Sequence, residues 1–483
     1  MEKNVNAWDL FLQQRRFDLI FKYLYVKNPC EYNKKAYIEN IRAFNGFKEN
    51  SSNGVVKKTS SDFVETYDEI IKSIESEGFD SSKSKVQVNE NGELMDGAHR
   101  LCVCACTGKD IMYEKCDLHA KWDYTYFRAK QMDESVMDYG ALEYVKLNPN
   151  AYIVNIMPVN NLEKDEKVVS ILEKFGFVYY KKDVWVTYNG LVNLKKVSYG
   201  SFWEGAKWIG DISNEFEGAR NHANNSMGRN PLRVFVFVCD DINKVVKAKK
   251  EIREIYKIGN YSVHINDTHE EAIQLAETYF NSNSLFMTNT RPFMLEDNEF
   301  DEHIEILKKA CEENNIKTDR VCGAGSTPMN VFQIRHSQDL DYLSLDVDIL
   351  PDNEIISTHN KYTHIYPYPI SEIIEDPNNF MYYKGIKFIS LDVLYLMKSK
   401  RREIPKDIFD LQKIRTILYY RKCVDVIKQL RINQNRGIRL QNFILLKIYK
   451  INKRLRPLFL RQRYWNFKSR VKETIKNLFR ITK

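Results

Sequence analysis

The chain of 483 residues is 43% hydrophobic and 13% aromatic, which is enough to build the cores of about two to four domains. No apolar run reaches the roughly 20 residues of a membrane-spanning helix, and the first residues, MEKNVNAWDLFLQQRRFD, lack the apolar region of a secretory signal. The net charge of +8 is unevenly spread, because residues 421–483 carry +17 and residues 1–420 carry −9.

The first motif lies in residues 86–108, VQVNENGELMDGAHRLCVCACTG. The pattern predicts a strand, a turn at Asn91-Gly92, a short strand, a tight turn and a helix. Gly97, His99 and Arg100 fall at the start of that helix, where backbone amides and basic side chains attract an anion.

This D-G-x-H-R-L segment resembles the ParB/sulfiredoxin superfamily over roughly residues 60–130. In that superfamily a Gly-x-His-Arg type turn holds nucleotide phosphates. The resemblance implies a phosphate- or nucleotide-contacting role for Gly97, His99 and Arg100. The alternative is a structural turn in which Arg100 pairs locally.

The nine cysteines form no evenly spaced framework and predict reduced thiols in a cytoplasmic protein. Several of them cluster with a histidine and raise the question of zinc: Cys102, Cys104, Cys106, Cys116 and His119. Their C-x-C-x-C spacing differs from the C-x₂-C of a zinc knuckle. We therefore expect the helical cysteines to pack as small apolar side chains.

The central region alternates strand and helix patterns and predicts an α/β unit. NAYIVNIMPV and PLRVFVFVC are typical of buried strands, and KVVSILEKFGF and INKVVKAKKEIREIYKIG are typical of amphipathic helices that end near a glycine. SVHINDTHEEAIQLAETYF predicts a strand, a cap at Asp267 or Thr268, and a helix.

Two polar, glycine-bearing stretches of this region, GSFWEGAKWIGD and GARNHANNSMGRNP, are candidate substrate loops. Their basic residues and that of the next strand, Arg220, His222, Arg229 and Arg233, could hold phosphate or carboxylate groups. His264 could act as a base, although a structural histidine at a strand end is as good an interpretation.

The most informative pattern is VCGAGSTPMNVFQIRHSQDLDYL, in which Gly325-Ser326 precedes Asp339-Leu340-Asp341. Side chains at i and i+2 of a strand share a face, so Asp339 and Asp341 would form an oxygen-rich site for Mg²⁺ or Mn²⁺. A Gly-Ser turn before a helix offers backbone N–H groups and a hydroxyl to a phosphate. These are the parts needed for metal-assisted phosphoryl or nucleotidyl transfer.

This layout resembles the nucleotidyltransferase superfamily. A second match follows in the correct order, in GIKFISLDVLYLMKSKRREIPKDIFDLQKI, where Lys398 and Arg401 precede a Lys-Asp-x-x-Asp run ending at Asp410. It is similar to the helical segment after the catalytic sheet of antitoxin-like and aminoglycoside-type members. Together the two matches cover roughly residues 300–420.

The resemblance implies metal-binding and catalytic roles for Asp339 and Asp341, and phosphate contacts for Gly325, Ser326, Lys398 and Arg401. The superfamily usually supplies a third carboxylate from a later strand, and this sequence has no clear counterpart. Asp346 and Asp348 have the opposite strand parity, which leaves Glu354 as a candidate carboxylate, while His359 and His364 could line the site instead. The domain is either active with an atypical metal site or a degenerate binding module.

The basic segment 421–483 keeps aliphatic and aromatic residues at helical spacing, and Pro457 would split it into two helices. Basic amphipathic helices with Trp and Phe bind anionic membrane surfaces. A helical cap packed on the enzyme is the main alternative, and nucleic-acid binding is the weaker one.

Taken together, the sequence predicts an α+β multidomain protein with four parts. These are a ParB/sulfiredoxin-like domain (1–148), an α/β region (149–291), a nucleotidyltransferase-like domain (292–420) and a basic helical tail (421–483).

The function that fits best is Mg²⁺-dependent nucleotidyl or phosphosugar transfer in bacterial surface-polysaccharide assembly. The donor would be a nucleotide or phosphosugar, the acceptor a lipid-linked glycan, and the location the inner membrane face. Two alternatives remain open. One is a glycosyltransferase with its chemistry in the N-terminal or central domain and a D-x-D that binds a metal-diphosphate. The other is a toxin–antitoxin-like modifier of RNA or protein.

Overall fold

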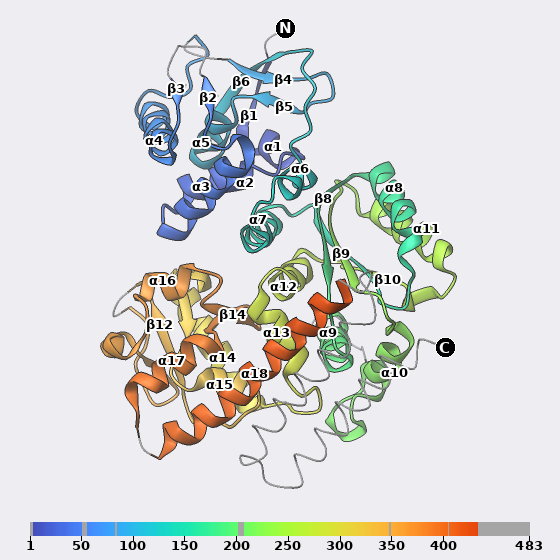
Figure 1. Cartoon of the computed structure of the whole chain (residues 1–483), viewed down its shortest axis with the longest axis vertical. Helices are drawn as coiled ribbons and strands as arrows, with labels where there is room; N and C mark the ends of the chain where they lie inside the picture. Colours follow the sequence, from blue (N-terminus) through green and yellow to red (C-terminus); the bar gives the residue numbers. More distant parts are fainter. Residues whose placement is uncertain are drawn as a thin grey trace. The chain divides into compact units, whose positions relative to one another are not determined.

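The structure is a computed structural model of the chain, and it describes residues 3–50, 56–82, 85–200, 207–346, 349–403 and 405–432. The chain divides into two compact units, residues 1–418 and residues 419–483. The first unit contains three sheets of four or five strands, each with helices of its own (Figure 1). The expected mixture of helices and strands is confirmed, in the form of several small sheets.

The N-terminal part is built on a four-stranded sheet of order β1-β6-β4-β5, in which only β4 and β6 run parallel. Its strands are β1 (Lys3–Asn6), β4 (Val86–Val88), β5 (Leu94–Asp96) and β6 (Asp110–Lys115), and β2 (Glu49–Asn50) pairs separately with β3 (Val56–Lys57). Its helices are α1 (Ala7–Leu12), α2 (Leu19–Lys27), α3 (Glu31–Asn45), α4 (Ser60–Glu77), α5 (Ala98–Thr107), α6 (Tyr124–Ala129) and α7 (Glu134–Leu147).

The strand–turn–strand–helix predicted for residues 86–108 is confirmed. Gly92, with φ +82°, lies in the turn between β4 and β5, and Gly97, with φ +89°, caps the start of α5. A Cβ on Gly97 would lie 2.6 Å from Cγ2 of Val86, so both the backbone conformation and the packing require glycine. Cys102 and Cys104 are fully buried in α5, as expected for packing residues.

The central part has an antiparallel sheet of order β10-β7-β9-β8. Its strands are β7 (Ala151–Ile156), β8 (Phe177–Val184), β9 (Leu232–Val238) and β10 (Val263–Ile265). Its α-helices are α8 (Asp165–Phe175), α9 (Tyr188–Gly200), α10 (Glu217–Ser226), α11 (Ile242–Tyr256), α12 (His269–Tyr279) and α13 (Ser282–Thr290). Short 3₁₀ turns lie at η1 (Leu162–Lys164), η2 (Lys207–Ile209), η3 (Ile212–Asn214) and η4 (Gly259–Tyr261).

Strand β9 illustrates why the strands of this sheet have almost uninterrupted apolar sequences. All seven of its residues are buried. Val234 and Val236 belong to the main core, whereas Phe235 and Phe237 belong to a second core under α8 and α11. Alternate side chains of a strand point to opposite faces, so both faces of this sheet are covered. The predicted strands and helices are confirmed, except that α11 ends at Lys257 in the left-handed conformation (φ +59°), before Gly259.

The C-terminal part of the first unit has a five-stranded mixed sheet of order β13-β12-β11-β15-β14. Central strand β11 runs antiparallel to β12 and parallel to β15. The strands are β11 (Val321–Gly323), β12 (Leu340–Ser344), β13 (Ile356–Thr358), β14 (Phe380–Tyr383) and β15 (Ile386–Ile389). The helices are α14 (Asn298–Glu313), α15 (Thr327–Val331), α16 (Ile370–Glu375), α17 (Leu391–Arg401) and α18 (Lys406–Ile432), with 3₁₀ segments η5 (Thr318–Arg320) and η6 (Asn360–Ile365).

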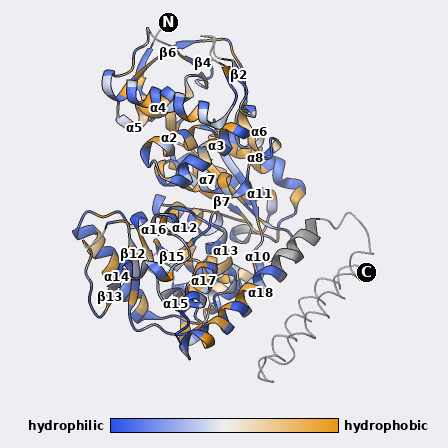
Figure 2. Ribbon diagram, turned by 60° about the vertical axis from the view of Figure 1, so that its left-hand side comes forward, coloured by the Kyte–Doolittle hydropathy of each residue, from blue (hydrophilic) through white to orange (hydrophobic). Residues whose placement is uncertain are grey.

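Helix α18 runs through the boundary expected near Tyr420, and the two compact units divide inside it, between Leu418 and Tyr419. Its early turns carry both hydrophobic and hydrophilic residues (Figure 2). The predicted basic tail lies outside the described residues from 433 onward. Among the helices that the structure describes, none is long and apolar enough to cross a membrane.

Candidate active site

The turn that follows β11 lies against the carboxylate of Asp341. Gly325 has φ +57°, and a Cβ at this position would lie 1.8 Å from Oδ2 of Asp341. The backbone N–H of Ala324 donates to the carbonyl oxygen of Asp341 (2.7 Å), which fixes the turn to β12. Only a residue without a side chain fits between this backbone and the carboxylate, so the glycine predicted for the site is a geometric requirement.

The N–H groups of this turn are already used within the chain, which corrects the expectation that they are free for a phosphate. Gly325 donates to the hydroxyl of Tyr366 (3.2 Å), and Thr327 donates to the carbonyl of Ala324 (3.1 Å). Burial raises the pKa of Asp341, and the N–H of Ser326, which faces the Asp341 carboxylate, opposes this rise. The turn therefore holds the carboxylate, and a phosphate would need other donors.

Asp341 is the more enclosed member of the D-x-D pair. Its Oδ1 accepts a hydrogen bond from Ser357 (3.0 Å) and lies 3.3 Å from Nε2 of His359. Burial raises the pKa of Asp341, and the nearby charge of Asp339 raises it further, while His359, Ser357 and the Ser326 amide oppose the rise. Asp339 precedes β12 and is half-buried. Two carboxylates that repel each other in this way form a place where a cation would be stabilised.

A chain of hydrogen bonds connects the turn to Asp341 by a second route. Nδ1 of His359 lies 2.7 Å from the hydroxyl of Tyr366, which also accepts from Gly325. Burial lowers the pKa of His359 and raises that of Tyr366, so the ring is neutral and the phenol keeps its proton. With the phenol donating to Nδ1, the Nε2–H of His359 donates to Asp341.

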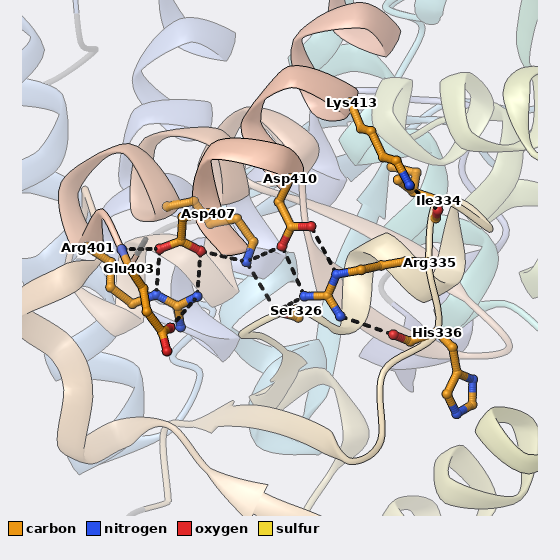
Figure 3. A network of polar contacts seen from close by, with 10 residues as sticks. Ser326, Ile334, Arg335, His336, Arg401, Glu403, Asp407, Asp410 and Lys413 are labelled. Carbon is orange, nitrogen blue, oxygen red and sulfur yellow. Dashed lines mark hydrogen bonds and ion pairs between the residues drawn. The ribbon is translucent and has the colours of Figure 1, made fainter. Parts of the chain in front are cut away.

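A network of ion pairs surrounds the hydroxyl of Ser326 (Figure 3). Nζ of Lys398 lies 3.2 Å and Nη2 of Arg335 lies 2.9 Å from Oγ of Ser326. Lys398 is fully buried and pairs with Asp407 (3.2 Å) and Asp410 (2.9 Å), and Arg335 also pairs with Asp410. A serine hydroxyl has two acceptor lone pairs and one proton. Because two cations occupy the lone pairs, the proton of Ser326 is left to donate to a further acceptor.

The structure thus gives Lys398 and Arg401 internal partners. Arg401 binds Asp407 with two hydrogen bonds (3.0 and 2.7 Å) and lies 3.3 Å from Glu403, which ties α17 to the start of α18. Arg335, which the sequence reasoning missed, is the cation beside Ser326 that remains partly exposed, at 23% of its side chain. Its position between the Gly-Ser turn and the D-x-D was the signal available in the sequence.

The candidates for a third carboxylate do not join the pair. Asp346 is bound by Arg320 (2.6 and 2.9 Å), Asp348 lies outside the described residues, and Glu354 and His364 are exposed. Among the residues that the structure describes, no group of three or more His, Cys, Asp and Glu side chains is arranged to hold a metal ion. A Mg²⁺ ion would therefore have the two aspartates as protein ligands and would need oxygens from a substrate phosphate and water, which is common for this ion.

The two basic candidates of the N-terminal part, His99 and Arg100, differ in whether their side chains have polar partners within the protein. Nε2 of His99 lies 3.0 Å from the hydroxyl of Tyr37, and its ring packs edge-on against Tyr67 (4.4 Å between centroids). Burial lowers the pKa of His99 well below its usual value, so this side chain is a neutral packing residue. Nη1 of Arg100 is buried and has no partner among the described residues, which leaves Arg100 as the available cation at this turn.

In the central part, the basic candidates take separate roles. Arg233 is fully buried and pairs with Asp165 (3.1 Å), and Arg220 pairs with Glu215 (3.3 Å), while Arg229 is exposed. Arg233 is thus a structural residue of β9.

The two candidate histidines of the central part, His222 and His264, lie against one tyrosine ring. Their rings lie at 5.8 Å (His222) and 4.9 Å (His264) from the ring of Tyr199. His264 is buried and bonds Glu271 (2.6 Å). Residues 201–206 of the first candidate loop lie outside the described residues.

Comparison of the chain with models of known protein families, with curated proteins and with solved structures finds no match. The geometry of the sites therefore carries the functional argument.

Proposed function

We propose that the chain is a Mg²⁺-dependent nucleotidyl- or phosphosugar-transferase whose active site is formed by the Gly325–Ser326 turn together with the Asp339/Asp341 pair. One observation carries this proposal: the turn and the carboxylate of Asp341 are fitted to each other so closely that no side chain could stand between them. A tight Gly-Ser turn held against an acidic pair brings phosphate-binding and metal-binding groups within one small site.

Each group of the site has a distinct role in this proposal. Asp339 and Asp341 would hold Mg²⁺, which when bound neutralises charge on the phosphates of the donor. The Ser326 hydroxyl would donate to a phosphate oxygen, and the partly exposed Arg335 beside it would pair with the phosphate charge. His359 would keep Asp341 in one orientation by donating to Oδ1.

In this proposal Lys398 acts on the phosphate indirectly, through the hydroxyl of Ser326. It is buried between two aspartates and touches Ser326, so it would orient the hydroxyl and leave direct contact with the phosphate to Arg335. A buried cation with two carboxylate partners has no net positive charge to offer a ligand. The family resemblance implied a direct phosphate contact for Lys398, and we assign that contact to Arg335 instead.

The wider setting of the reaction rests on the sequence. Arg100 at the start of α5 would bind a second phosphorylated ligand, and the basic tail would bring the enzyme to an anionic membrane surface. Activated sugars and lipid-linked glycans are substrates that such an arrangement suits. Surface-polysaccharide assembly is therefore the process that we favour.

The proposal is tested by product analysis of the full-length protein with Mg²⁺ and each labelled nucleoside triphosphate, sugar nucleotide and phosphoribosyl diphosphate. Release of pyrophosphate from a triphosphate that requires Asp341 supports nucleotidyl transfer. Release of a nucleotide from a sugar donor supports the glycosyltransferase alternative, and labelling of tRNA or protein supports the toxin–antitoxin-like alternative. Product formation that is unchanged in Asp341→Asn would contradict the proposed site.

A further inference from the structure

A buried lysine of the central part has no use in the proposed transferase reaction. Lys195 lies on α9, is only 2% exposed, and its Nζ lies 3.3 Å from Sδ of Met157. Within the described part of the chain, no carboxylate forms an ion pair with it. Burying an ammonium group without a counter-charge is costly, and burial lowers the pKa of Lys195 to about 7.

Aromatic rings connect this amine to the other candidate residues of the region. Tyr199 lies one helical turn after Lys195, and its ring centroid is 6.0 Å from Nζ. The same ring lies 5.2 Å from Trp208, 5.8 Å from His222 and 4.9 Å from His264. Residues from α9, η2, α10 and β10 therefore form one cluster around Tyr199, the ring next to Lys195.

The cluster reaches the surface at its other end. Trp208 is 46% exposed and Tyr261 is 39% exposed, and the half-buried ring of His222 lies 5.6 Å from the first and 5.0 Å from the second. A Cβ on Gly218 would lie 1.5 Å from the carbonyl oxygen of Trp208, so this glycine allows α10 to pack against η2. The ring contacts thus extend from the exposed Trp208 and Tyr261 to Tyr199, the ring beside Lys195.

Burial keeps the amine of Lys195 neutral by lowering its pKa. Burial and the nearby Lys195 lower the pKa of His222, to about 3, and both also lower that of His264. His264 is held by Glu271, whose carboxylate also accepts from the backbone N–H of Asp267. Glu271 is thus bonded to His264 and not to Lys195, and burial is the cause that lowers the pKa of Lys195. A desolvated, neutral lysine is the form that attacks carbonyl carbons.

We propose that Lys195 is the nucleophile of a second site, which forms an imine with an aldehyde or ketone that enters between Trp208, His222 and Tyr261. The amine lone pair attacks the carbonyl carbon, and the carbonyl oxygen then leaves as water with the two amine protons. The C=N bond replaces the C=O bond, and no oxidant or reductant is needed. An open-chain sugar is the class of ligand that suits aromatic walls with a few polar groups. This site is separate from the proposed transferase site and does not depend on it.

The test is reductive trapping on the full-length protein. Glyceraldehyde is added with sodium borohydride at a series of pH values, and labelled peptides are quantified by mass spectrometry. Lys247, an exposed lysine of α11, is the internal comparison. At pH 7.5 a group of pKa about 7 is mostly neutral, whereas an ordinary lysine is neutral in about one molecule in a thousand. We expect Lys195 to be labelled at least about 10-fold more than Lys247, with half-maximal labelling near pH 7.

Two variants make the result decisive. Lys195→Met should remove the labelled peptide, and Trp208→Ala, a change at an exposed residue, should reduce labelling of Lys195 several-fold while leaving Lys247 unchanged. Labelling of Lys195 that does not exceed that of Lys247 would overturn the proposal. Labelling of Lys195 that is strong and unchanged in Trp208→Ala would overturn the proposed entry of the aldehyde or ketone between the aromatic rings.

Discussion

Gly325→Ala is the substitution for which the structure gives the sharpest expectation. The new Cβ would lie 1.8 Å from Oδ2 of Asp341 and would also occupy a backbone with φ +57°. The left-handed conformation costs an L-residue about 1–2 kcal/mol. Moving the carboxylate away would weaken hydrogen bonds from Ser357 and Ser326, and a hydrogen bond to a charged group contributes about 1.5–3 kcal/mol. We expect the variant to lose about 3–4 kcal/mol of stability.

Gly46→Ala is the matched control, because Gly46 has φ +63° and a Cβ there would meet nothing within 4 Å. It should lose only the conformational contribution, about 1–2 kcal/mol. Urea unfolding of both variants gives the difference from midpoint and slope. Turnover should fall at least about 100-fold in Gly325→Ala, because moving a catalytic group by about 1 Å lowers the rate by about that factor. Turnover should stay normal in Gly46→Ala. Equal stability losses with normal turnover in both variants would refute the close fit.

Three further outcomes are expected. Lys398→Met leaves two buried carboxylates, Asp407 and Asp410, without their shared cation. The free energy of unfolding should fall by about 3 kcal/mol, and a fall of less than about 1 kcal/mol would contradict the burial of this network. Arg100→Ala should weaken binding of a phosphate ligand by about 1.5–3 kcal/mol in calorimetry, and unchanged affinity for every nucleotide or phosphosugar would exclude this contact. Truncation after Tyr420 should release the protein from anionic vesicles at low salt while sparing turnover on a soluble acceptor, and full-length protein that fails to sediment with vesicles would exclude the membrane role.

Sequence patterns were informative where local geometry decides the structure. The Asn91-Gly92 turn, the glycine before α5 and the cap at Thr268 followed from residue types whose backbone preferences are strong. The closeness of Gly325 to the D-x-D was also foreseeable, because a short spacer links the end of one strand to the start of its neighbour.

The sequence patterns did not predict which residues far apart in the chain contact one another. Nothing local says that Lys398 is buried between two aspartates, that Arg335 turns toward Ser326, or that the amides of the Gly-Ser turn are already bonded. Lys195 sits in a helix of ordinary appearance, and only the packing of distant aromatic rings shows that its amine is buried. Pairings of this kind depend on the fold as a whole, which periodicity does not encode.

A Mg²⁺ titration of turnover tests whether Asp339 and Asp341 act with Mg²⁺ at the Gly-Ser turn. Wild-type protein, Asp339→Asn, Asp341→Asn and the control Glu354→Gln, which removes an exposed carboxylate of the same region, are compared at matched fold stability. We expect Mg²⁺-dependent turnover in wild type and Glu354→Gln, and a loss of several orders of magnitude in both aspartate variants. Near-normal, Mg²⁺-dependent turnover in both aspartate variants would contradict it.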